Sequence, residues 1–204
     1  NERRHQLHEV IRLSGMNLVI NDVDHPLIIK VASIPSARMQ VYFIDNEEFF
    51  SRKAILTDKT SGKYFDDNDE RAIFFCKSVL ETVKKLGWAP DIVHCNDWMT
   101  SLIPMYLKTT YKKDPLFKNA KIVFTIHSDG FFSHKFDKKL LNKVKMIDIE
   151  DSMLGPLQTA DYGGFIRIGA AYADAVITPQ ENKKSEKINK LLQDVSKLKN
   201  AELI

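Results

Sequence analysis

The chain has few cysteines and no long apolar run. Cys76 and Cys95 are its only two cysteines, too few for the disulfide framework of a small secreted protein and typical of a reducing compartment. No apolar stretch approaches the ~20 residues that a membrane-spanning helix needs. We therefore expect a cytoplasmic protein with no membrane partner.

The chain also lacks a marked excess of charge of either sign. Its 30 basic and 27 acidic residues leave a formal net charge of +3. A nucleic-acid-binding protein usually carries a clear basic excess on one face, so we do not expect nucleic acid as a partner. The hydrophobic content of 44% is ordinary for a globular protein with a true core. Because the chain begins at Asn1 rather than Met, we expect it to start within a longer protein.

Two strand-like segments end in side chains that can do chemistry. Asp91–Cys95 leads directly towards Asp97, and Lys121–Ile126 leads to His127. The carboxyl ends of neighbouring parallel strands lie on one edge of a sheet, where open α/β sheets bind ligands. The sequence therefore predicts that His94, Asp97 and His127 lie along one such edge.

The segments around these two alternate between helix and strand. A run of apolar residues at helical spacing lies between Asp66–Asp69 and Gly87, and a second helix over Phe165–Ala173 leads to a strand at Ala175–Thr178. Pro104 is expected to kink the helix that follows Asp97. This alternation predicts an α/β fold, a Rossmann-like parallel sheet flanked by helices.

The N-terminal side of the chain has a different pattern. Residues 27–34 and 39–45 are rich in β-branched and aromatic residues and flank a turn, which predicts a β-hairpin. Residues 1–17 contain apolar positions without a clear cap, and we interpret them as a short helix or an irregular arm. Residues 46–67 are polar and aromatic and are interpreted as a surface loop.

The tail of the chain forms a separate element in our prediction. We assign residues 1–180 to the Rossmann-like domain and residues 181–204 to an amphipathic C-terminal helix. From Glu186, apolar residues recur on one helical face and lysines on the other. Such a helix can bind a partner or pack on its own domain, and we favour packing.

Five segments resemble, in order, signatures of the bacterial glycogen synthase and plant starch synthase family. Pro-Asp-Ile-Val-His-Cys-Asn-Asp-Trp, ending at Trp98, resembles P-D-[IV]-[IV]-H-x-H-D-W, and Val-Phe-Thr-Ile-His, ending at His127, resembles [VF]-T-[IV]-H-N. The other three are Val41–Asp45 with Phe50-Ser-Arg52, Tyr64–Arg71, and Phe165–Asp174. The resemblance implies the first of the two Rossmann-like domains of a GT-B glycosyltransferase.

The resemblance also implies a reaction and its substrates. The family transfers glucose, with retention at the anomeric carbon, from ADP-glucose to an α-1,4-glucan. ADP-glucose is a donor substrate, and no cofactor or metal is implied. A second domain or subunit would complete the enzyme. Asp97 and His127 would be catalytic, contacting the acceptor and the transferred glucose; the implied substrate-binding residues are His94, Asn96, Trp98, Ser128 and Arg167.

Each of these residues also has a plainer interpretation. Asp97 can be an ordinary helix N-cap, and His127 can be held in the core. Trp98 more often packs against a helix than stacks on a sugar, and Arg167 can be ordinary helix surface. The spacing of the histidines and Cys95 does not fit the paired motifs of structural zinc sites, so we expect no metal.

The chain departs from the family pattern in ways that leave a second hypothesis open. Asn96 and Ser128 replace a His and an Asn of the signatures, and Arg167 replaces a Lys. The Lys-x-Gly-Gly loop that opens the family domain does not occur in the sequence. The alternative is a non-catalytic glucan-binding or regulatory half-domain that has lost donor binding. On either hypothesis, we expect the isolated chain to be inactive.

Overall fold

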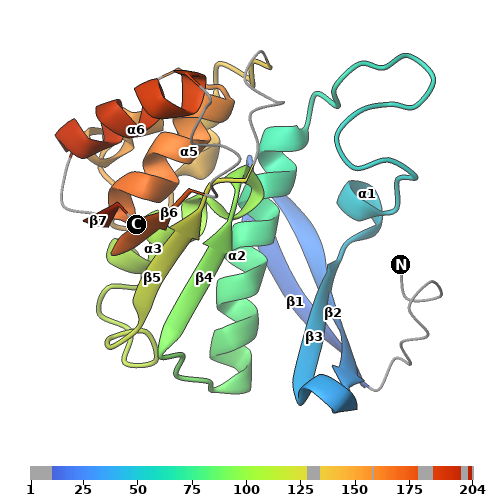
Figure 1. Ribbon diagram of the computed structural model, residues 1–204. Coiled ribbons are helices and arrows are strands. Elements are labelled where there is room, and N and C mark those ends of the chain that lie inside the picture. Colours follow the sequence, from blue (N-terminus) through green and yellow to red (C-terminus); the bar gives the residue numbers. More distant parts are fainter. Residues whose placement is uncertain (1–10, 128–133, 158, 179–185, 199–201, 204) are drawn as a thin grey trace. The chain divides into compact units, whose positions relative to one another are not determined.

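The computed structural model describes residues 11–127, 134–157, 159–178, 186–198 and 202–203 (Figure 1). The chain divides into two compact units, Asn1–Ile55 and Leu56–Ile204, and each is described by itself. None of the helices in the described ranges combines the length and apolar composition that a bilayer crossing requires.

The first unit is a three-stranded antiparallel sheet in the order β1-β2-β3. The predicted hairpin is confirmed, because β2 pairs with β3 across a short 3₁₀ turn at Pro35–Ala37. The loop predicted over residues 46–67 contains one short helix, α1. The elements of this unit are β1 (Ile11–Ile20), β2 (Val23–Ile34), β3 (Met39–Asp45) and α1 (Glu47–Phe50).

The prediction of a helix or irregular arm is wrong for the part of residues 1–17 that the structure describes, because β1 is a strand. Along its C-terminal half, less exposed side chains alternate with more exposed ones, and the strand ends with exposed Val19 and buried Ile20. A half-buried strand has this alternation. The pairing register shifts between Leu13 and Met16, where Gly15 has a φ of +85°. This bulge interrupts the alternation and hides the strand pattern in the sequence.

The second unit is an all-parallel sheet in the order β4-β5-β6-β7 with flanking helices, which confirms the predicted fold class (Figure 1). Sequence reasoning did not foresee β7. The strands are β4 (Ile92–Asn96), β5 (Lys121–Thr125), β6 (Ala175–Ile177) and β7 (Glu202–Leu203). The helices are α2 (Asn68–Leu86), α3 (Leu102–Lys108), α4 (Leu140–Val144), α5 (Tyr162–Tyr172) and α6 (Glu186–Leu198), with 3₁₀ turns at Trp98–Thr100 and Asp151–Leu157.

Helix ends in this unit follow the chemistry of their residues. Gly87 ends α2 in the left-handed conformation, with a φ of +68° and its N–H bonded to the Lys84 and Val83 carbonyls. The expected effect of Pro104 is wrong. It is the third residue of α3, and an N–H in the first turn has no intrahelical acceptor, so the missing donor costs nothing there.

The apolar face of α6 is buried within the second unit. Ile188, Leu191 and Val195 are at most 4% exposed, and Figure 1 shows α6 beside α5. The tail helix thus packs on its own unit, as we favoured over the binding of a partner. The assignment of residues 1–180 and 181–204 to separate domains stays a prediction.

Helix α5 approaches the sheet closely because Gly169 has no side chain. A Cβ at this position would lie 2.8 Å from two ring atoms of Phe124 on β5 and 3.0 Å from the Cβ of Ser101. Phe124 is fully buried, so its ring has little room to yield. Gly169 therefore sets the distance between α5 and the sheet.

We expect Gly169→Ala to lower the free energy of unfolding by about 1–3 kcal/mol, because the added methyl group overpacks the contact with Phe124. Urea denaturation followed by circular dichroism measures the change. Gly155→Ala is the matched control, since a Cβ at that position would have no other atom within 4 Å, and we expect a shift below about 1 kcal/mol. Equal stability of the two variants would contradict the close-packing argument.

Candidate functional site

The carboxyl ends of β4 and β5 meet at one edge of the sheet, as predicted. The two strands pair in parallel, with Asn96 opposite Thr125. One residue later the ladder gains a further bond, from the Asp97 N–H to the Thr125 carbonyl at 2.8 Å. His127 follows β5 by two residues, and its ring Nε2 lies 2.8 Å from the Asn96 side-chain oxygen. The strand ends therefore bring Asn96, Asp97 and His127 together.

Asp97 has a strained backbone. Its φ of +60° and ψ of −174° lie in a region that is almost restricted to glycine and costs of order 1–3 kcal/mol for other residues. The Asp97 side chain makes no capping bond to the following 3₁₀ turn, so the plain N-cap interpretation is wrong. The Thr100 N–H and hydroxyl bond instead to the Asp97 backbone carbonyl. Strain of this kind is concentrated at functional sites.

Tyr162 holds the Asp97 carboxylate and was missed by sequence reasoning. This tyrosine, the first residue of α5, is fully buried, and its hydroxyl donates to Asp97 Oδ1 at 2.7 Å. Burial raises the pKa of Asp97 above its ordinary value, while the bond from Tyr162 and the backbone N–H groups of Trp98 and His127 oppose that rise. A single tyrosine before a glycine pair carries no local signal, because its partner is 65 positions away.

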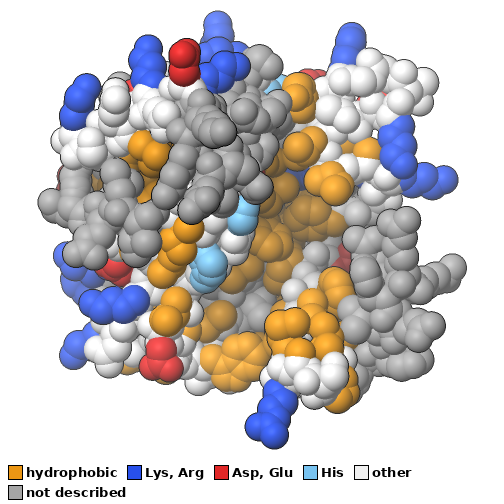
Figure 2. Space-filling model, viewed as in Figure 1, with side chains coloured by type: hydrophobic (Ala, Val, Ile, Leu, Met, Phe, Trp, Pro, Cys, Tyr) orange, Lys and Arg blue, Asp and Glu red, His pale blue; other side chains and the backbone are white. Residues whose placement is uncertain are grey.

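His127 and Asn96 form an exposed pair at the surface of the site. A side-chain carbonyl only accepts hydrogen bonds, so Nε2 of His127 carries the shared proton. Figure 2 shows histidine side chains reaching the surface among hydrophobic side chains.

His94 contacts a different partner. Its side chain lies on the exposed face of β4, where Ile92 is 64% exposed. The reason is that β4 forms the edge of its sheet. The His94 Nε2 lies 2.7 Å from the hydroxyl of Thr125, a buried residue of β5 that sequence reasoning also missed.

Trp98 packs within the second unit. It is 6% exposed and lies 5.9 Å, between ring centroids, from both Phe136 and Phe165, stacked on the first and edge-on to the second. Trp98 therefore packs within the protein, as the sequence favoured over stacking on a sugar. The aromatic cluster anchors the chain directly after the strained Asp97.

Arg167 does not join the other predicted site residues. Its Nε donates to the Pro156 carbonyl at 3.2 Å, and its Nη2 donates to the Thr159 hydroxyl. It lines a pocket in which none of the other predicted site residues that the structure describes takes part. Ser128 lies outside the described residues. Across the described ranges, no group of three or more His, Cys, Asp or Glu side chains has an arrangement that could hold a metal ion.

Comparison with known proteins relates this chain to a family. A family profile described as "Starch synthase catalytic domain" matches residues 1–193. The chain belongs to the starch synthase catalytic domain family. Among similar proteins, a glycogen synthase of Chlorobium phaeobacteroides is 43% identical over 144 residues, 69% of this chain and 29% of that protein. A glycogen synthase of Chlorobaculum tepidum is 38% identical over 186 residues, 89% of this chain and 36% of that protein.

A solved member of the family has the same fold. The catalytic domain of starch synthase IV from Arabidopsis thaliana, bound to ADP and acarbose, superposes with a TM-score of 0.68 at 18% identity, covering 94% of this chain and 40% of that one. The predicted family resemblance and the GT-B half-domain are thereby confirmed. The chain spans only about a third of the length of the curated family members it matches.

We expect Tyr162→Phe to raise the pKa of Asp97 further, because the bond that stabilises the ionised carboxylate is lost. At neutral pH the free energy of unfolding should fall by about 1.5–3 kcal/mol, as for a hydrogen bond to a charged group. The loss should shrink as the pH falls and Asp97 becomes protonated. Carboxyl ¹³C NMR titration and urea denaturation at several pH values measure both effects. An unchanged Asp97 titration would contradict the role given to Tyr162.

Proposed function

We propose that this chain is the acceptor-binding half of a retaining glucosyltransferase that moves glucose from ADP-glucose to an α-1,4-glucan. The observation that carries the proposal is the strained Asp97, whose carboxylate is held by buried Tyr162 beside His127. A folded protein keeps such strain where the surrounding contacts enforce it, and it is enriched at ligand-binding positions.

The chemistry of the two strand ends suits a sugar. The Asp97 carboxylate has two oxygens with about four lone pairs in all. Tyr162 and the backbone N–H groups of Trp98 and His127 account for three of them, which leaves acceptor capacity for a sugar hydroxyl group. His127 is exposed and presents an imidazole beside this carboxylate. Its proposed task is to position the transferred glucose and to stabilise developing charge rather than to attack it.

The donor and the rest of the reaction centre belong to the proposal as well. ADP in the Arabidopsis structure supports an adenine nucleotide sugar as donor. Because the chain spans about a third of its relatives' length, we infer that a second domain or subunit binds most of the nucleotide. ADP-glucose would enter as a substrate, and no metal or other cofactor is part of the proposed mechanism.

A second function is favoured by one observation at the same site. The side-chain oxygen of Asn96 accepts the hydrogen bond from Nε2 of His127. This neutral amide does not exchange protons near neutral pH. This arrangement suits the binding of hydroxyl groups as well as it suits catalysis. The alternative is therefore a glucan-binding or regulatory half-domain without transferase activity.

We expect calorimetric titration to show that the chain binds maltoheptaose. Asp97→Ala and His127→Ala should each weaken this binding about tenfold or more, because each removes a hydrogen-bonding group from the site. Asp151→Ala is the control for Asp97, because the Asp151 side chain is 83% exposed, and it should leave the affinity unchanged. Circular dichroism confirms that each variant is folded. Absence of binding by the folded wild-type chain, or equal affinities throughout, would overturn the proposed acceptor site.

We expect the isolated chain to transfer no measurable glucose, because the residues that grip the donor diphosphate lie elsewhere under this proposal. The measurement is incorporation of radiolabel from ADP-glucose into glycogen. A full-length glycogen synthase from Chlorobaculum tepidum serves as the positive control for the assay. Radiolabel in glycogen with this chain alone would contradict the division of the active site between two domains.

A further inference from the structure

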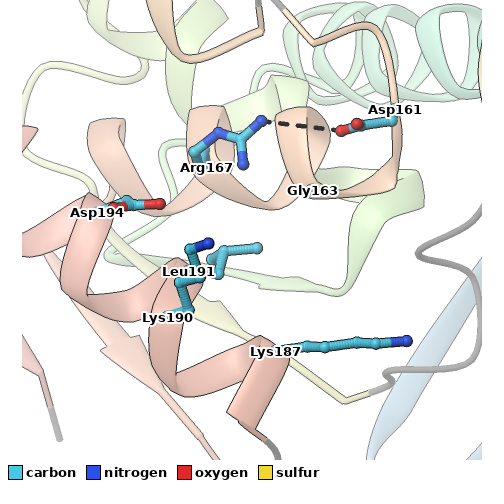
Figure 3. Close-up of a pocket in the computed structure, with 7 residues that line it drawn as sticks. All are labelled: Asp161, Gly163, Arg167, Lys187, Lys190, Leu191 and Asp194. Carbon is cyan, nitrogen blue, oxygen red and sulfur yellow. Dashed lines mark ion pairs between the residues drawn. The ribbon is translucent and has the colours of Figure 1, made fainter.

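A pocket lies between α5 and α6, apart from the residues at the strand ends. Its volume is about 220 Å³, and it is lined by Asp161, Gly163, Arg167, Lys187, Lys190, Leu191 and Asp194. Figure 3 shows Arg167 on α5 above Lys190 and Leu191 on α6, while the Lys187 side chain extends away from Arg167. Pockets for drug-sized ligands measure roughly 300–1,000 Å³, so this pocket suits a smaller molecule.

Cationic groups outnumber carboxylates in this pocket. Arg167, Lys187 and Lys190 line it together with two carboxylates. One of these, Asp161, is already matched by Lys135, whose Nζ lies 3.1 Å from its Oδ2. Although burial raises the pKa of Asp161, bonds from the Gly164 N–H, Thr159 and Lys135 together lower it. Among the described residues that line the pocket, cationic groups therefore exceed carboxylates.

Two donors in the pocket have no acceptor within the described part of the chain. The Arg167 Nε donates to Pro156, and its Nη2 contacts Thr159 and Asp161. Its Nη1 has no acceptor among the described residues. Among the described residues, the backbone N–H of Gly163, in the first turn of the eleven-residue helix α5, also has no acceptor, since the Asp161 cap accepts from Gly164. Gly163 is buried, and an unbonded donor there favours an acceptor that arrives with a ligand.

Gly163 also makes room for the guanidinium group. A Cβ at this position would lie 3.2 Å from Nη1 of Arg167 and 3.3 Å from Oδ1 of Asp161. Both contacts are tighter than most Cβ contacts, so a larger residue would require the Arg167 guanidinium or the Asp161 carboxylate to shift by a few tenths of an ångström. The glycine thus keeps an arginine and a helix N-terminus aimed at the same space.

We propose that this pocket binds a small phosphate monoester that also carries hydroxyl groups. The phosphate would accept from Nη1 of Arg167, from the Gly163 N–H and from Lys190, since arginine and helix N-termini are the usual partners of phosphate oxygens. The Asp194 carboxylate would accept from a hydroxyl group of the same ligand. The site is separate from the acceptor site and does not depend on the glucosyltransferase proposal.

Calorimetric titration with ribose 5-phosphate tests the proposal, with inorganic phosphate and ribose as separate probes. We expect ribose 5-phosphate to bind, inorganic phosphate to bind more weakly, and ribose not to bind. Arg167→Gln and Lys190→Gln should each weaken ribose 5-phosphate binding about tenfold or more, the loss expected of one charge-assisted hydrogen bond. Gly163→Ala should weaken it through displacement of Arg167.

Lys85→Gln is the matched control, because it makes the same change of charge at an exposed helical side chain that lies outside the pocket. It should leave the affinity unchanged. Lys190 makes no ion pair within the described residues, so its variant should fold even if Arg167→Gln does not. Equal affinity of all variants for ribose 5-phosphate would indicate unspecific attraction by surface charge and would overturn the site. The site would also be overturned if the wild-type chain did not bind ribose 5-phosphate, or if it bound ribose equally well. Asp97→Ala should retain ribose 5-phosphate binding, which separates this result from the acceptor site.

Discussion

The candidate acceptor site depends on one hydrogen bond that continues the β4–β5 ladder past the end of β4. The Asp97 N–H donates to the Thr125 carbonyl, so the backbone stays in register with β5 for one more residue. The next residue, Trp98, must already begin a 3₁₀ turn. In this structure both conditions are met by an unusual backbone at Asp97, with a positive φ. The cost of order 1–3 kcal/mol is offset by packing on the far side of the turn, where Trp98 contacts Phe136 and Phe165.

Helix α5 links this strain to the rest of the second unit. Gly169 lets the helix approach β5, and that approach places Tyr162, two turns earlier, within hydrogen-bond distance of Asp97. The preceding residue, Asp161, caps the same helix and lines the neighbouring pocket. The first turn of α5 therefore contributes to two separate surfaces. Repacking at Gly169 would alter the orientation of the Asp97 carboxylate without touching it.

The parts of the structure that the sequence predicted are those with local causes. The hairpin, α2 with its end at Gly87, and the strands β4 and β5 each follow from periodicity and turn residues that lie within one short window. The parallel pairing of β4 with β5 follows instead from the alternation of strands and helices. Strand β1 was missed because a bulge at Gly15 breaks its alternation. Tyr162 and Thr125 were missed because each acts on a residue far away in the chain, and no short window contains both partners. Arg167 is held by the Pro156 carbonyl and the Thr159 hydroxyl, and a motif on α5 does not encode these partners.

The departure from the family signature at Asn96 has a structural counterpart. Asn96 accepts a hydrogen bond from His127, so the imidazole keeps its proton on Nε2 and is held at the strand end. A histidine at position 96 could exchange that proton near neutral pH, whereas an amide cannot. The pair is therefore arranged to hold a ring in place and not to relay a proton. Under the proposed function, this unit orients the acceptor and the transferred sugar, and the groups that stabilise the leaving diphosphate act from outside it. Such a division requires only that Asp97 and His127 keep their geometry, which is what the ladder bond and Tyr162 provide.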